Sequence, residues 1–233
     1  MRGRAAAMSP AGGGYRVPWR RGRCRLLPMV DIQGFRDAVT RWADGGPGDP
    51  ADVLAAQPGV RTVVLVEGLS DLAAVETLAA RRGRDLAAEG VCVVSMGGAM
   101  NIGRYAGLLG PPGLGLRLTG LCDVREQPYY ERGLKRAGAS QEGFFVCVSD
   151  LEDELIRALG TPRVEEIVGA EGDLRAWLTF LRQPAQHGRP REQQLRRFLG
   201  TKKGRKIRYG HLLVDALEPG QVPAPLDDLL ASV

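Results

Sequence analysis

The chain has 233 residues, of which 44% are hydrophobic, so it can bury the core of one domain of ordinary size together with appended segments. Its formal charge of +5 permits a polyanionic partner, although an arginine-rich proteome would give the same excess. Its four cysteines lack the CxxC spacing of a zinc site. No apolar run approaches the ~20 residues that span a bilayer. We therefore expect a cytoplasmic protein without a membrane partner.

The N-terminal part divides into two predicted segments. Residues 1–30 contain several arginines and no acidic residue, and because they cannot bury enough apolar surface to fold alone we expect a disordered basic extension. Residues 31–58 are predicted to form an N-terminal helical segment. Apolar residues recur at helical intervals from Asp31 to Trp42, glycines after Asp44 end this helix, and a short helix is expected at 50–57.

An apolar run from Thr62 to Val66 predicts a strand that is buried on both faces, as in a parallel sheet covered by helices. The run ends in Glu67, and Ser70 is expected to cap a helix that begins at Asp71. In open α/β sheets, ligands bind beyond the carboxyl ends of the strands. Glu67 would project into that region.

Strands and helices alternate in the middle of the chain. Further strands are predicted at 91–95, 116–121 and 143–148, with helices between them. Each crossover is long enough for a right-handed βαβ unit, so the predicted fold class is α/β, with a mostly parallel central sheet flanked by helices. From about residue 154 onward the apolar spacing is helical, which predicts a helical C-terminal portion.

Acidic residues follow three of the four predicted strands. They are Glu67 with Asp71, Asp123 with Glu126, and Asp150 with Glu152. Because parallel strands align their carboxyl ends, these groups should converge on one edge of the sheet. Crowded carboxylates repel one another unless a cation lies among them, and oxygen ligands suit Mg²⁺ or Mn²⁺. A single acid after a strand is more often a solvated turn residue or a helix cap, and we assign Asp153 and Glu154 to a solvated helix start.

Four motifs stand in order along the chain: VLVEGLSD at 64–71, GGAMNI at 97–102, GLCD at 120–123 and FFVCVSDLEDELI at 144–156. Together they resemble a Toprim domain, and more narrowly the Toprim half of the OLD (overcoming lysogenization defect) family nucleases. Toprim domains usually carry a DxD motif after the third strand. Here the sequence reads Asp123-Val124-Arg125, and the missing second aspartate suits the OLD-like branch.

The resemblance implies a Rossmann-like Toprim domain over residues 59–160, and the helical spacing after it predicts a helical C-terminal extension over 161–233. It implies a site that binds Mg²⁺ or Mn²⁺, with Glu67 also catalytic. The implied metal ligands are Glu67, Asp71, Asp123, Asp150 and Glu152. A weaker match near 203–217 makes Lys206 the candidate to neutralise charge on the transition-state phosphate, with a solvated basic face as the alternative.

These features predict a Mg²⁺-dependent phosphoryl-transfer enzyme, specifically a two-metal nuclease that cleaves DNA phosphodiester bonds. The basic segment 189–208 would contact phosphates, with Lys202, Lys203, Arg205 and Arg208 as candidates; for Lys202 and Lys203 a solvated face is the alternative. Two other functions stay open: a Toprim nucleotidyl transferase or hydrolase of small phosphorylated substrates, and a non-catalytic docking or regulatory module. OLD nucleases join an ATPase to the Toprim domain. This sequence has no GxxxxGK[ST] phosphate loop, so we expect a free-standing Toprim protein whose ATPase, if it uses one, is a separate chain.

Overall fold

The computed structural model describes residues 32–46 and 59–233. At its centre is a four-stranded sheet whose strand order is β2-β1-β3-β4, with every neighbouring pair parallel. The strands are β1 (Thr62–Val66), β2 (Val91–Ser95), β3 (Arg117–Asp123) and β4 (Phe144–Cys147). The predicted α/β class and the four predicted strands are confirmed. The predictions for residues 1–30 and for the helix at 50–57 lie outside the described residues.

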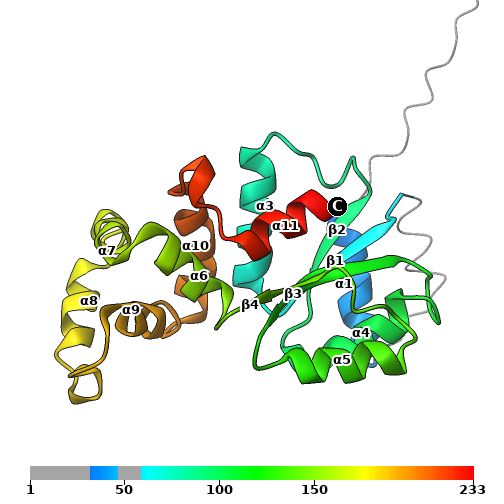
Figure 1. The fold of residues 1–233 in the computed structure, drawn as a ribbon, viewed down its shortest axis with the longest axis horizontal. Coiled ribbons are helices and arrows are strands. Elements are labelled where there is room, and N and C mark those ends of the chain that lie inside the picture. Colours follow the sequence, from blue (N-terminus) through cyan, green and yellow to red (C-terminus); the bar gives the residue numbers. More distant parts are fainter. Residues whose placement is uncertain (1–31, 47–58) are drawn as a thin grey trace, which may run out of the picture.

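Strand β1 is buried on both faces because successive side chains of a strand point to opposite sides of the sheet. Val64 and Val66 belong to the core on one face, where α3 (Leu69–Arg81) packs. Val63 and Leu65 belong to the core on the other face. That second face is covered by α1 (Ile32–Ala43), α4 (Ile102–Leu109) and α5 (Gln127–Arg136). Figure 1 shows the sheet between these two helical layers.

A glycine fixes the close approach of β1 and β3. Gly120 pairs with Leu65 in register, and a Cβ at Gly120 would lie 2.0 Å from the Leu65 carbonyl oxygen, so no side chain fits there. One step further along the sheet, Asp123 at the end of β3 pairs with Cys147 at the end of β4. The carboxyl ends of β1, β3 and β4 therefore reach the same edge, as the sequence predicted.

The turn after β1 differs from the prediction. Helix α3 begins at Leu69 with Gly68 as its N-cap, and the Gly68 N–H donates to Asp71 Oδ2 at 2.9 Å. The predicted capping role of Ser70 is therefore wrong, because the carboxylate of Asp71 reaches back to the start of the helix as in a capping box. Ser70 instead lies in the first turn, where a Cβ on Gly210 would come within 2.6 Å of its carbonyl oxygen.

The remaining chain is helical, as predicted, and is packed on the sheet domain (Figure 1). Its helices are α6 (Leu151–Leu159), α7 (Thr161–Ala170), α8 (Leu174–Leu181), α9 (Arg191–Leu199), α10 (Lys203–Asp215) and α11 (Ala224–Ser232). Helix α10 lies along α3, and α11 returns to β3 and β4. Just after α10, the Leu217 carbonyl accepts a hydrogen bond from Arg81 of α3 at 2.8 Å. The boundaries proposed at 59–160 and 161–233 stay a prediction. Among the described helices, none is long and apolar enough to cross a membrane.

Candidate metal centre

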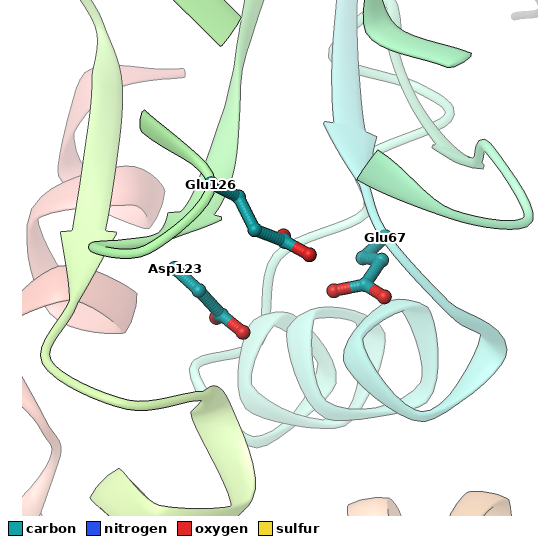
Figure 2. Close-up of side chains that lie close together, drawn as sticks. All are labelled: Glu67, Asp123 and Glu126. Atoms are coloured by element: carbon teal, nitrogen blue, oxygen red, sulfur yellow. The ribbon is translucent and has the colours of Figure 1, made fainter. Parts of the chain in front are cut away.

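Three carboxylates at the ends of β1 and β3 or just after them meet at the carboxyl edge of the sheet. They belong to Glu67, Asp123 and Glu126, and one oxygen from each lies within 4.8 Å of the others. All three side chains are partly buried. Figure 2 shows them converging on a common space from the ends of the two neighbouring strands. Carboxylate oxygens grouped at this spacing can share a cation.

Backbone hydrogen bonds hold these carboxylates in place. The Glu67 carbonyl accepts the N–H of Gly98 at 3.0 Å, which ties the end of β1 to the glycine turn after β2. The Glu126 N–H donates to the Asp123 carbonyl at 2.9 Å, closing a tight turn immediately before α5. The sequence places Glu126 near a strand end, but the predicted ligand set omits it. The signal that points to it is this short turn, which returns Glu126 to the side of Asp123.

The structure brings the whole predicted ligand set together. A small cavity of about 20 Å³, room for about one water-sized sphere, is lined by Glu67, Asp71, Asp123, Asp150, Glu152 and Lys206. These acids and Glu126 are called the acidic site below. Their convergence follows from the parallel strand order, although metal binding by each of them stays a prediction.

Lys206 compensates one of the buried acids. Its ammonium nitrogen lies 3.1 Å from Glu152 Oε1, and the Glu152 side chain is only 7% exposed. Neither carboxylate oxygen of Glu152 accepts a well-directed hydrogen bond within the described part of the chain. A buried carboxylate is costly unless it is paired and hydrogen-bonded, so Glu152 keeps capacity for a further cation.

Asp150 is held by two other groups. Its Oδ1 accepts the Asp153 N–H at 2.8 Å, so it caps α6, and its Oδ2 lies 2.5 Å from Arg196 Nη2 of α9. Arg196 was not identified from the sequence, because only the packing of α9 against α6 brings it to Asp150. The arginine fixes the orientation of the Asp150 carboxylate beside the cavity.

Glu154 corrects a further expectation. The sequence predicts that it lies in a solvated helix start, yet its side chain is buried. Its Oε1 accepts the Val148 N–H at 2.8 Å, and its Oε2 lies 2.6 Å from Arg157 Nη2. The reason is that α6 turns back over the end of β4, where the N–H of Val148 needs an acceptor. Asp153 pairs with Arg157 at 3.0 Å on the outer side of the same helix.

Burial and mutual repulsion raise the pKa values of three carboxyls in the acidic site, those of Asp71, Asp123 and Glu126. For Asp123, burial is the largest cause and the charges of Asp150 and Glu126 add to it, so its pKa rises to about 8. Burial, and then the charge of Glu152, raises the pKa of Asp71 to about 7. Burial, and then the charge of Glu67, raises the pKa of Glu126 to about 7. A divalent cation would oppose these shifts, because it would replace the protons that the crowded carboxyls otherwise retain.

The donor atoms fit a hard divalent cation. Glu126 Oε2 and both carboxylate oxygens of Glu152 are buried without a hydrogen-bond partner among the described residues. The side chains that converge here are carboxylates, without histidine or thiol ligands in the described three-residue group. Oxygen-only donors favour Mg²⁺ or Mn²⁺ over zinc.

The residues predicted to contact nucleic acid in the basic segment differ in their burial and in their ion pairs. Arg205 is buried: Nη2 lies 3.1 Å from Asp173 Oδ1, and its guanidinium lies over the Phe198 ring, 4.1 Å from the centroid. Its guanidinium is thus committed to the fold, which does not fit the predicted role in binding phosphate. Arg208 is exposed but pairs with the same aspartate, Lys202 is exposed, and Lys203 is the first residue of α10.

A larger open cleft, with a volume of about 690 Å³, adjoins the acidic site and shares Glu67 and Lys206 with it. One wall is the outer face of α1 and the turn after it, with the exposed acids Asp37 and Asp44 and with Arg36, which pairs with Glu76. The opposite wall is formed by the turns after β1 and β2, including Gly98. The cleft is therefore large enough for a small ligand but is acidic on its α1 side.

A parallel sheet with carboxylates gathered at its carboxyl edge defines the class: an α/β domain of the Toprim type. More narrowly, residues 60–124 match the family model described as "Overcoming lysogenization defect protein-like, TOPRIM domain". The chain therefore contains an OLD-like Toprim domain, and the predicted resemblance is confirmed. The matched residues include Glu67, Asp71 and Asp123, whereas Glu126 and the residues supplied by β4 and the C-terminal helices lie beyond them.

Solved structures agree with this assignment. The C-terminal region of the Burkholderia pseudomallei OLD protein has 22% sequence identity and a TM-score of 0.57, over 74% of this chain and 96% of that chain. The C-terminal region of the Xanthomonas campestris pv. campestris OLD protein, in structures phased with mercury and with iodine, has 26% and 27% identity. Both have a TM-score of 0.54, over 74% of this chain and 93% of theirs. No curated protein matches the sequence significantly.

Proposed function

We propose that this protein is a divalent-cation-dependent nuclease that hydrolyses phosphodiester bonds in DNA. The observation that carries the proposal is the meeting of acids from three strand ends with Lys206 around one small cavity. The match to an OLD-like Toprim domain supports it, because the motifs of this sequence resemble the Toprim half of the OLD family nucleases.

Six carboxylates would hold Mg²⁺ or Mn²⁺: Glu67, Asp71, Asp123, Glu126, Asp150 and Glu152. When bound, such cations supply an activated water and stabilise the leaving oxygen of a phosphodiester. The buried carboxylate oxygens of Glu126 and Glu152 that lack hydrogen bonds are the atoms best explained by this role.

The residues of the chain contribute orientation and charge. The Glu152 carboxylate holds the Lys206 ammonium at the cavity, where it would neutralise charge that develops on the phosphate. Arg196 and the Asp153 N–H fix the Asp150 carboxylate, so it does not have to reorganise when substrate binds.

The adjoining cleft favours a second candidate, a nucleotidyl transferase or a hydrolase of small phosphorylated molecules. Its volume of about 690 Å³ lies within the range of small-ligand pockets, about 300–1,000 Å³. Asp37 and Asp44 would repel a small phosphorylated ligand held inside this cleft, and Arg36 beside them is already paired with Glu76, so the nuclease is preferred. A docking module for a separate ATPase chain remains the non-catalytic alternative.

The test measures cleavage of supercoiled, linear and single-stranded DNA in the presence of Mg²⁺, Mn²⁺ or EDTA. We expect cleavage only with a metal, and a loss of about 100-fold or more in Glu67→Gln and in Glu126→Gln, because each removes a ligand charge. The matched control is Glu142→Gln, an exposed acid before β4 at the opposite edge of the sheet, which should leave cleavage unchanged.

Three outcomes would contradict the proposal. Cleavage that survives both Glu67→Gln and Glu126→Gln would remove the acidic site as the catalytic centre. Phosphate release from nucleotides without cleavage of any DNA would support the small-substrate enzyme. Failure to bind Mg²⁺ or Mn²⁺ in a calorimetric titration would support the docking module.

A further inference from the structure

Helix α5 has one buried face and one exposed face. Tyr130, Gly133 and Leu134 are buried, and a Cβ on Gly133 would lie 2.9 Å from the backbone nitrogen of Gly103, so α5 packs tightly on α4. Tyr129, Arg132 and Arg136 are exposed. Their spacing of three and four residues places them on one side of the helix. The close packing beneath holds this side in a fixed position.

The exposed side of α5 and the turn before it are basic, and their charges are not used inside the fold. Arg125, Arg132, Lys135 and Arg136 are all exposed, and none forms an ion pair or a side-chain hydrogen bond with any residue of 32–46 or 59–233. Glu131 is the one acid in the sequence of α5. These four cations are therefore available to a polyanion.

An exposed aromatic side chain lies among these cations. Tyr129 is 42% exposed, and the guanidinium carbon of Arg132 lies 4.9 Å from the centroid of its ring. An aromatic ring beside arginines is the combination on which proteins stack the bases of single-stranded nucleic acid. Stacking requires an exposed base face, which a base-paired duplex does not offer.

The helix also leads away from the acidic site. Glu126, one of the site carboxylates, is the residue immediately before α5. The ten residues of α5 span about 15 Å at ~1.5 Å per residue, the length of about four stacked nucleotides at ~3.4 Å each. The other flank of the site is the cleft, where Asp37 and Asp44 are exposed and Arg36 is already paired with Glu76, so this flank disfavours phosphates. Of these two flanks, only the α5 side therefore attracts a polynucleotide.

We infer that Arg125, Tyr129, Arg132, Lys135 and Arg136 form a binding track for single-stranded polynucleotide, which delivers the strand to the acidic site. The inference rests on the proposed function and extends it to the substrate class and the side of approach. Phosphates contact the four cations, and a base next to the scissile position stacks on Tyr129.

The test is fluorescence anisotropy of labelled oligodeoxythymidine, oligouridine and duplex DNA, in EDTA so that binding is measured without cleavage. We expect Arg132→Glu/Arg136→Glu to weaken single-strand binding by tenfold or more. The slope of log K against log salt should become shallower by about 1.4, because two phosphate contacts are lost and each contributes ~0.7 to the slope. The matched control is Arg175→Glu/Arg182→Glu, two exposed arginines in α8 and at its C-cap, with the same change in charge. Figure 1 shows α8 at the opposite end of the molecule from α5. The control should bind within twofold of wild type.

Tyr129 separates stacking from charge. Tyr129→Ala should weaken single-strand binding about tenfold with little effect on duplex, whereas Tyr129→Phe should bind like wild type because it keeps the ring. Circular dichroism and thermal melting identify any variant that fails to fold. Equal losses in the α8 control, or full binding by both Tyr129→Ala and Arg132→Glu/Arg136→Glu, would overturn the track. Tighter binding of duplex that is insensitive to Tyr129 would also overturn it.

The same measurements keep the two proposals apart. Binding that depends on the track without cleavage under any metal condition would contradict the nuclease and leave the track in place. Cleavage with unaltered binding in the α5 variants would contradict the track and leave the nuclease in place.

Discussion

Helices α5 and α10 are both basic in sequence but use their charges in different ways. In α10, Arg205 and Arg208 pair with Asp173, and Lys206 pairs with Glu152. In α5, Arg132 and Arg136 have no such partner within the described chain. A cluster of positive charge therefore becomes a candidate nucleic-acid surface only where the fold leaves it without counter-charges.

The comparison predicts its largest effect on stability at Arg205. Arg205→Met removes one partner of a buried ion pair and leaves Asp173 without its main counter-charge, so the free energy of unfolding should fall by about 3 kcal/mol. Arg132→Met on α5 is the matched control and should change it by less than about 0.5 kcal/mol. Urea denaturation followed by circular dichroism measures both values. Equal losses in the two variants would mean that α5 and α10 do not differ as described.

The next effect is on catalysis and lies within α10. Lys206→Met should lower the rate of DNA cleavage about 100-fold, or about 2.7 kcal/mol, because the ammonium at the cavity is lost. Arg208→Met, two residues away and pointing to Asp173, should leave the rate within about twofold. Single-turnover cleavage assays measure both. A comparable loss in Arg208→Met would show that the general charge of α10 matters, and not the position of Lys206.

The smallest predicted effect concerns the acidic site that lies between the two helices. The pKa of Asp71 is raised from 3.8 to about 7 and that of Asp123 from 3.8 to about 8, so between pH 4 and pH 8 the folded chain binds more protons than the unfolded chain. Stability that is present at low pH is then lost as the pH rises through these values. In EDTA, the Tm should fall by about 5 °C between about pH 5.5 and about pH 8.5.

A divalent cation supplies the control for this pH effect. Mg²⁺ should raise the Tm more at the higher pH than at the lower. At the higher pH the carboxyls of the folded chain have already lost their protons, so the cation binds without having to displace them. A metal-free Tm that rises over this range would contradict the crowding of carboxylates at the edge of the sheet. Differential scanning calorimetry with and without the metal distinguishes the two results.

The strands were predictable because their signal is local. A run such as Thr62 to Val66 is apolar on both faces, and this pattern requires burial between two layers. The convergence of Glu67, Asp123 and Asp150 was also predictable, since parallel strands can only place their carboxyl ends at one edge. The capping of α3 was not, because Gly68 and Asp71 share a role that sequence spacing assigned to Ser70.

The charged residues were less predictable because their partners are distant in the sequence. Arg196 reaches Asp150, and Arg205 reaches Asp173, only through the packing of the C-terminal helices. Glu126 joined the site because of a tight turn whose closure does not show in composition or periodicity.

The sequence by itself therefore determined the parallel α/β sheet, the edge at which the acids gather and the likeness to an OLD-like Toprim domain. Hydrophobic burial at each strand and the common direction of the strands are sufficient for the sheet and the edge. The order of the four motifs is sufficient for the likeness. The tertiary structure alone decided which basic side chains are neutralised by ion pairs and which remain available, because ion pairing depends on where a side chain from another helix comes to lie. That distinction separates Lys206 at the acidic site from Arg205 in the core, and it marks the outer face of α5.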